Sequence, residues 1–251
     1  MNDFHWLDHI LFVLLGIAFP MQTFRDTKPQ LAKIEDWDTY TKGLLYISNG
    51  ALLLGLALVA VLVWYFTGKP MSTLGFQLPK AGSWGAGILY AALFLLLYLA
   101  DVYRSIRSPE SLLHTYTHWR ENTPFLPENW RDMKPFYFLI FGAAVGEEII
   151  FRGFILTYLL MWFGPSMEAQ KAAILLSSAV FAIVHYYQGW KAVAKIGCLS
   201  IIFGILFLST GSLLFPIILH FIIDWLGGYF SIWMTGKIKM TRPDLFEDEE
   251  E

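Results

Sequence analysis

The stretch Gly146-Glu147-Glu148-Ile149-Ile150-Phe151-Arg152 (GEEIIFR) places ionisable side chains inside one of the most apolar parts of the chain. The residues before it read FYFLIFGAAV, and those after it read GFILTYLLMWF. A charge at the centre of a membrane helix costs roughly 2.5–3.5 kcal/mol, so such residues usually face the interior of a helix bundle and carry out a function. The stretch therefore predicts a membrane helix that takes part in a polar site.

The composition of the whole chain indicates a polytopic membrane protein. Of the 251 residues, 56% are hydrophobic and 16% are charged, whereas soluble domains contain about half apolar and about a quarter charged residues. The formal net charge of −3 gives no basis for nucleic-acid binding. Cys198 is the single cysteine, which excludes an intrachain disulfide. The acidic run EDEEE at residues 247–251 is expected to be a disordered, solvated tail.

Segments of about 20 mostly apolar residues are long enough to cross a bilayer. We expect an all-α transmembrane bundle of about seven spans, with a surface helix in the third loop, residues 105–134. Ser108 before Pro109 and Glu110 predicts the start of that helix, whose apolar face is expected to lie on the membrane. The expected spans are residues 6–24, 43–67, 83–104, 135–163, 166–187, 192–210 and 212–235.

Lys and Arg in the loops set the orientation of a membrane protein. With the N-terminus outside, most loop cations face the cytoplasm, and Lys69, Lys80 and Lys171 remain outside. The C-terminus is then cytoplasmic. The chain accordingly divides into residues 1–134 with the N-terminal spans and a cytoplasmic amphipathic loop, 135–235 with the polar groups at membrane depth, and 236–251 as an acidic cytoplasmic tail.

Helix geometry predicts different roles for the two glutamates. Glu148 and Arg152 are four residues apart with the acid first, the better order for an ion pair on one helix face. Glu147 lies about 100° around the helix from Glu148 and has no local partner. A carboxylate in apolar surroundings beside another carboxylate can hold or accept a proton near neutral pH, as general acid–base catalysis requires. We therefore expect Glu147 to be the catalytic group.

Two further spans contribute polar side chains at depth. His185 stands alone near the cytoplasmic end of 166–187, and 212–235 contains His220 and Asp224. Because they are four residues apart, Asp224 is expected to accept a hydrogen bond from His220 and to fix its tautomer.

The carboxylates outnumber Arg152, so the cluster must retain a proton, carry a charged histidine or bind a cation. The first case gives a protease that activates water. The last gives a divalent metal site, such as zinc, at Glu147, His185 and His220. The motif HExxH is absent from the sequence, which argues against a zincin-like helix.

Three motifs, in this order, resemble those of the CPBP family of intramembrane glutamic proteases. EEIIFR fits EExxxR, FAIVH at residues 181–185 fits FxxxH, and HFIID at residues 220–224 fits HxxxN/D. The family includes the type II CAAX prenyl endopeptidases and the bacterial, Abi-like relatives linked to bacteriocin processing and immunity. The resemblance covers roughly residues 135–235 and implies that they form a catalytic core.

The resemblance implies an intramembrane endopeptidase that needs no cofactor and cuts near the cytoplasmic side. Glu147 would activate the attacking water and His185 would help to hold it. Glu148 and Arg152 would support the site, while His220 and Asp224 would lie near the oxyanion. The best-described prenyl proteases have Asn in the last position. An ionised Asp224 cannot donate a hydrogen bond, so it is either protonated or orients His220.

The partners expected from this interpretation are the lipid bilayer and a membrane protein or peptide substrate, lipidated or not, with no nucleic acid. Two alternatives remain open at this stage. One is a metal-dependent membrane protease that uses the same Glu/His cluster. The other is a non-enzymatic bacteriocin-immunity or partner-binding membrane protein, which would not need both glutamates.

Overall fold

A computed structural model describes residues 4–34 and 36–245, and the regular elements in this part of the chain are all helical, as the sequence predicts. The acidic run at 247–251 lies outside the described residues. The elements are α1 Trp6–Phe12, η1 Val13–Ala18, α2 Phe19–Leu31, α3 Thr39–Phe66, η2 Met71–Leu74, α4 Trp84–Ile106, α5 Pro109–Asn122, α6 Trp130–Glu147, η3 Glu148–Leu156, α7 Thr157–Phe163, α8 Met167–Ile183, η4 Tyr186–Gln188, α9 Trp190–Thr210, α10 Leu214–Thr241 and η5 Pro243–Leu245.

Five helical runs of the described chain are long and apolar enough to cross a membrane: Trp6–Leu31, Thr39–Phe66, Trp84–Ile106, Trp190–Thr210 and Leu214–Thr241. The expected count of seven spans is therefore not confirmed. The run through α6, η3 and α7 carries Glu147, Glu148 and Arg152 within its apolar part, and α8 has only 17 residues. The expected boundary at residue 235 also falls inside a helix, because α10 continues to Thr241.

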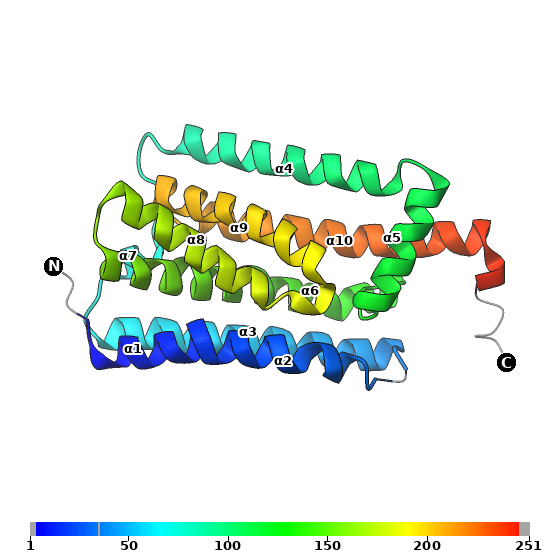
Figure 1. Cartoon of the computed structure of the whole chain (residues 1–251), viewed down its shortest axis with the longest axis horizontal. Coiled ribbons are helices and arrows are strands. Elements are labelled where there is room, and N and C mark those ends of the chain that lie inside the picture. The colour runs from blue at the N-terminus through cyan, green and yellow to red at the C-terminus, as the bar shows by residue number, and fades with distance from the viewer. Residues whose placement is uncertain (1–3, 35, 246–251) are drawn as a thin grey trace.

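The long helices lie side by side, with α1, α2 and α3 on one side of the bundle and α4 on the other (Figure 1). Between them lie α6, α8, α9 and α10, while α5 crosses one end. The helices that carry the polar side chains are thus central, where neighbouring helices separate them from lipid. This is the position expected for costly charges in a membrane bundle.

Glycines allow α6 to approach α3 at backbone distance. A Cβ atom on Gly142 would lie 2.6 Å from the Cα of Gly50, and one on Gly146 would lie 2.8 Å from the carbonyl carbon of Leu53. Gly142 and Gly146 are four residues apart, the small-xxx-small spacing by which membrane helices pack closely. This contact fixes the position of α6 along α3 at Gly146, one residue before Glu147.

The helix expected in the third loop is present as α5, and Ser108 caps it by accepting a hydrogen bond from the backbone N–H of Ser111. Its apolar face, however, was expected on the membrane, and this expectation is wrong for Leu112 and Tyr116. Both side chains are buried against Met234 and Ile238 at the end of α10. The helix α5 therefore closes one end of the protein bundle.

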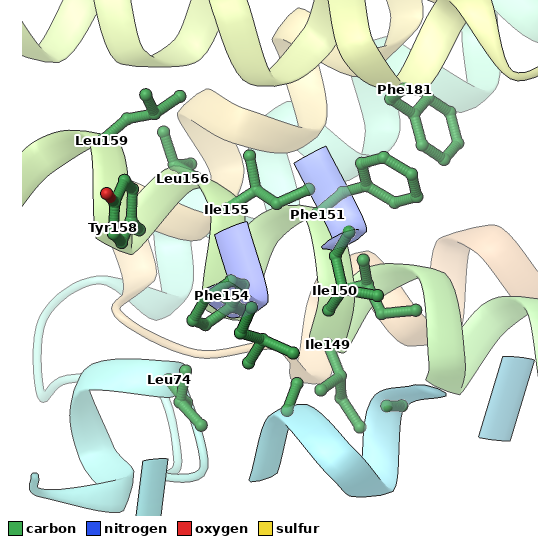
Figure 2. Packing of buried hydrophobic residues seen from close by; sticks show 14 of the residues in the cluster. Leu74, Ile149, Ile150, Phe151, Phe154, Ile155, Leu156, Tyr158, Leu159 and Phe181 are labelled. Atoms are coloured by element: carbon green, nitrogen blue, oxygen red, sulfur yellow. The ribbon is translucent and has the colours of Figure 1, made fainter. Parts of the chain in front are cut away.

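The π-helical segment η3 lies at the centre of the main hydrophobic core. All of its residues are buried, and Figure 2 shows Ile150, Phe151, Phe154 and Ile155 spreading from it into the surrounding helices. The Phe151 ring meets the Phe181 ring of α8 edge-on at 5.0 Å. The segment that follows Glu147 is thus held rigidly, although its backbone departs from α-helical geometry.

Candidate active site

The two glutamates lie where α6 changes into the π-helix η3. Glu147 is the last residue of α6, and Glu148 is the first residue of η3. Short π-helical segments are rare and occur frequently at functional sites. The sequence interpretation assumed regular α-helical spacing, so it did not anticipate this change of backbone geometry.

His220 on α10 lies at the centre of the carboxylates. Its Nδ1 is 2.7 Å from Oε1 of Glu148, whereas its Nε2 is 3.7 Å from Oε2 of Glu147 and 3.6 Å from Oδ2 of Asp224. Only the first distance is that of a hydrogen bond. The expectation that Asp224 fixes the tautomer of His220 is therefore corrected, because Glu148 accepts from Nδ1 instead.

The ion pair expected between Glu148 and Arg152 is formed, with Nη1 of Arg152 donating to Oε1 of Glu148 at 2.8 Å. Arg152 is also held from other helices. Its Nη2 donates to the hydroxyl of Ser200 on α9 at 2.8 Å, and its guanidinium carbon lies 4.2 Å from the ring centre of Phe181 and 5.1 Å from that of Phe203. The guanidinium is thus enclosed by two aromatic rings, and it is 2% exposed.

Ser200 and Phe203 are residues of the site that the sequence does not indicate. Both lie on α9, a segment with no ionisable side chain at membrane depth, so no charge pattern indicates them. Phe181 is the first residue of the FxxxH motif, which by itself indicates no role for the ring. Its position four residues before His185 was the only available signal.

Glu147 has a different environment from Glu148. Its atom Oε2 is buried and has no hydrogen-bond partner in the described part of the chain. The interpretation of Glu147 as the carboxylate without a local partner therefore agrees with the structure. Its expected separation from Glu148 around the helix does not exclude a shared neighbour, since both carboxylates reach the imidazole of His220.

His185 follows the end of α8, and its Nδ1 lies 2.9 Å from the backbone carbonyl of Phe181. A carbonyl can only accept, so Nδ1 carries the hydrogen, and Nε2 of the neutral ring is left with a lone pair. In the described residues no hydrogen bond or ion pair joins His185 directly to Glu147. The two side chains instead line the same cavity.

The cavity has a volume of about 1130 Å³, slightly larger than the roughly 300–1,000 Å³ of typical ligand sites. Five of the six site residues predicted from the sequence line it. The sixth, Glu148, is fully buried and contacts His220. Helices outside the central group also line it. They include α2, α3, α4 and α5. Lys191 and Lys195 of α9 line the cavity as well, and both are exposed.

The metal-dependent alternative requires donors that lie close together. Among residues 4–34 and 36–245, no group of three His, Cys, Asp or Glu side chains lies close enough to hold a metal ion. His220 and His185 each use Nδ1 for a hydrogen bond, to Glu148 and to the Phe181 carbonyl, so Nε2 of each ring is the nitrogen left for another partner. The zinc site suggested at Glu147, His185 and His220 stays a prediction.

Residues 129–226 match the family model described as Type II CAAX prenyl endopeptidase Rce1-like. This segment is similar to that family. The match agrees with the resemblance noted in the motifs, and the matched segment includes every residue of the candidate site. Together with the apolar helices it supports an integral membrane protein.

One curated relative is the uncharacterized protein YpbD of Bacillus subtilis (strain 168). It is 29% identical over 96 residues, which make up 38% of this chain and 44% of the length of YpbD. The chain thus spans less than half of that relative. No solved structure matches the chain.

Proposed function

We propose that this protein is an intramembrane endopeptidase of the glutamic type, in which Glu147 activates water for attack on a peptide bond. The observation that carries the proposal is the state of Glu147. Its carboxylate lies on a large cavity, and its buried Oε2 has no hydrogen-bond partner in the described part of the protein. Since a buried polar atom ordinarily has a partner, this oxygen is suited to hold a water molecule or a proton.

The chemistry divides among the side chains as follows. Glu147 takes a proton from the water, which Nε2 of His185 also holds, and the hydroxide attacks the scissile carbonyl carbon. The Nε2–H group of a protonated His220, whose Nδ1–H is donated to Glu148, stabilises the negative charge that develops on the carbonyl oxygen. Glu147 then gives its proton to the nitrogen of the leaving amine as the C–N bond breaks. One water molecule is consumed, and the carboxylate of Glu147 is regenerated.

Glu148 and Arg152 act behind these groups. Glu148 accepts from Nδ1 of His220 and so directs Nε2 towards Glu147 and Asp224. Arg152 neutralises Glu148, which is fully buried. Asp224 is half-buried at the cavity, within 3.6 Å of Nε2 of His220, where it can adjust the charge of the imidazole without fixing its tautomer.

The proposed substrate is a membrane-embedded peptide or protein that reaches the site from the cytoplasmic side. The lining of the cavity is largely apolar, as an extended segment in a membrane requires, and its solvent-exposed part carries Lys191 and Lys195. In the orientation with the N-terminus outside, these lysines are cytoplasmic. Single cysteines introduced at residues 80 and 237 should be labelled by an impermeant maleimide from opposite sides of intact cells, residue 80 from outside.

The proposal is tested with Glu147→Gln, which keeps the size of the side chain but cannot take a proton. A matched control is Glu168→Gln, because Glu168 is an exposed residue of α8 paired with Lys171, remote from the cavity in its contacts. Membranes from cells that express each variant are compared by mass spectrometry of protein termini. We expect an uncleaved membrane protein to accumulate with Glu147→Gln and not with the control.

Purified protein in lipid nanodiscs then tests the reaction directly on that accumulated protein. Glu147→Gln should lower the cleavage rate by at least about 1,000-fold, the scale on which a lost catalytic group acts. Its thermal unfolding should match that of the wild type. Cleavage by Glu147→Gln at the wild-type rate would exclude the mechanism, and a phenotype preserved by both Glu147→Ala and His185→Ala would favour a binding protein.

A further inference from the structure

Within the described part of the chain, the hydroxyl of Ser200 is the one polar contact that α9 makes with the buried charges of the candidate site. Ser200 is 3% exposed and lies at 2.8 Å from Nη2 of Arg152. Phe203, three residues further along α9, faces the same guanidinium. The helix α9 thus presents one hydroxyl and one aromatic face to Arg152, although its sequence reads as a plain apolar span.

We propose that Ser200 is a positioning residue that sets the direction of the catalytic imidazole through Arg152 and Glu148. This inference rests on the proposed peptidase function for its kinetic consequences, but its geometric part does not depend on it. The contacts form one continuous series. Ser200 accepts from Nη2 of Arg152, Nη1 of Arg152 donates to Oε1 of Glu148, and the same Oε1 lies 2.7 Å from Nδ1 of His220.

The series transmits position because the guanidinium is planar and presents its donors in a fixed fork. When Nη2 is held by Ser200, the direction of Nη1 is fixed as well. The rings of Phe181 and Phe203 restrict rotation of the plane. Removing the Ser200 hydroxyl leaves a buried donor of Arg152 without its acceptor, and the guanidinium can then turn towards another oxygen.

A turn of Arg152 affects His220 because one oxygen of Glu148 serves both groups. Oε1 receives Nη1 of Arg152 and contacts Nδ1 of His220, whereas Oε2 of Glu148 is buried without a partner in the described residues. A displaced Arg152 can therefore move to Oε2 and rotate the carboxylate. The hydrogen bond to His220 would then lengthen, and Nε2 would shift relative to Glu147.

The test compares Ser200→Ala with Ser231→Ala, a matched control. Ser231 is a buried serine on α10, 7% exposed, that does not line the large cavity. Uniformly ¹⁵N-histidine-labelled protein in nanodiscs gives the imidazole resonances, and the His220 signals are assigned by their loss in His220→Gln. We expect Ser200→Ala to shift the Nδ1 resonance of His220 and Ser231→Ala to leave it unchanged. An unchanged Nδ1 resonance in Ser200→Ala would overturn the proposal.

Kinetics on the protein identified with Glu147→Gln give the second measurement. Ser200→Ala should lower kcat about 10- to 100-fold, the effect of a small misplacement of catalytic groups, with KM within about twofold of the wild type. The pH dependence of kcat should also shift in Ser200→Ala. Ser231→Ala should change neither kcat nor its pH dependence. A loss of kcat of equal size in both variants would mean general loosening of the fold and would refute the assignment.

A pair of nearly isosteric variants decides the matter if Ser200→Ala does not fold. Ser200→Thr keeps the hydroxyl, whereas Ser200→Val has almost the same shape without it. Retention of the His220 resonance and of kcat in the threonine variant alone supports positioning, and equal behaviour of the two contradicts it. If Glu147→Gln shows that the protein is no peptidase, the resonance of His220 still tests the role of Ser200.

Discussion

The close packing of α6 on α3 should fix the position of Glu147 in the bundle. The variant Gly142→Ala tests this prediction. The added Cβ would lie 2.6 Å from the Cα of Gly50 and 2.7 Å from its carbonyl oxygen. Both are backbone atoms of a helix, so no side chain can move aside. An ordinary contact needs more than 3.4 Å, and the helices must therefore separate by about 1 Å.

Overpacking of this kind typically costs about 1–3 kcal/mol, and a clash with backbone belongs at the upper end. We therefore expect Gly142→Ala to lower the free energy of unfolding by about 2–3 kcal/mol. The matched control is Gly55→Ala on the same α3 helix, where a Cβ meets nothing within 4 Å. It should change the free energy of unfolding by less than about 1 kcal/mol, in the stabilising direction, because alanine favours the helix.

The measurement is reversible unfolding in mixed micelles, followed by tryptophan fluorescence, for the wild type and both variants. Proteolysis in nanodiscs under conditions where the variants are folded gives the functional counterpart. Since Glu147 is five residues from Gly142, a displacement of about 1 Å should reduce kcat by up to about 100-fold. Equal stabilities for Gly142→Ala and Gly55→Ala would refute the packing argument.

Three further substitutions and one reagent test other parts of the reasoning. Lys42→Met should lower the free energy of unfolding by about 3 kcal/mol, because the buried Asp132, which is 1% exposed, loses the cation that lies 3.5 Å away. Adding Asp132→Leu should restore most of this loss. Denaturation curves that show additive effects of the two substitutions would contradict the pairing. Arg152→Lys should cut kcat at least about 10-fold with the fold intact by circular dichroism, since lysine cannot reproduce the planar fork; wild-type kinetics would show that charge alone suffices. Asp224→Asn should keep activity within about threefold, because the distance of 3.6 Å from Oδ2 of Asp224 to Nε2 of His220 is too long for a hydrogen bond. A loss of about 100-fold would show that Asp224 orients His220 after all. A strong chelator should leave cleavage unchanged, because the proposed mechanism uses no metal ion, whereas a loss that zinc reverses would favour the metal-dependent alternative.

Much of the fold could be predicted because apolar length is a simple signal. Helices α3, α4, α9 and α10 are read directly from runs of about 20 apolar residues, and each begins within a few residues of its expected start, although α10 extends past its expected end. The run that contains Glu147 is helical from Trp130 to Phe163 but is not among the five candidate spans of the described chain, and its Glu148 and Arg152 side chains are buried by the bundle. Burial by neighbouring helices is a tertiary property that a local window of sequence does not contain.

The apolar face of α5 shows the same limit. Leu112 and Tyr116 have the helical spacing of a membrane-surface helix, and the sequence offers no means of telling lipid from protein as the covering surface. In the structure α10 extends past the expected membrane boundary, and Met234 and Ile238 cover this face. The longer α10 and the protein contact of α5 are thus two results of one interaction.

The candidate site was predictable where it depends on spacing within one helix and unpredictable where it depends on contacts between helices. Four-residue spacing correctly pairs Glu148 with Arg152. The same rule applied to His220 and Asp224 gave the wrong hydrogen-bond partner, because Glu148 of another helix is nearer at 2.7 Å. Ser200 and Phe203 gave no signal at all, since a hydroxyl and a ring are ordinary residues of an apolar span.

The π-helical turn at Glu148 explains why neither glutamate could be assigned fully from α-helical geometry. Adjacent residues of a helix point in different directions, which should separate a catalytic carboxylate from a structural one. Here both glutamates reach the same side chain, because the two ring nitrogens of His220 lie on opposite sides of the ring and each faces one glutamate. A single imidazole can therefore be held by Glu148 through Nδ1 while it faces Glu147 through Nε2. The separation of the two carboxylates around the helix and their action on one group are consequently compatible, and the side chain that reconciles them comes from α10.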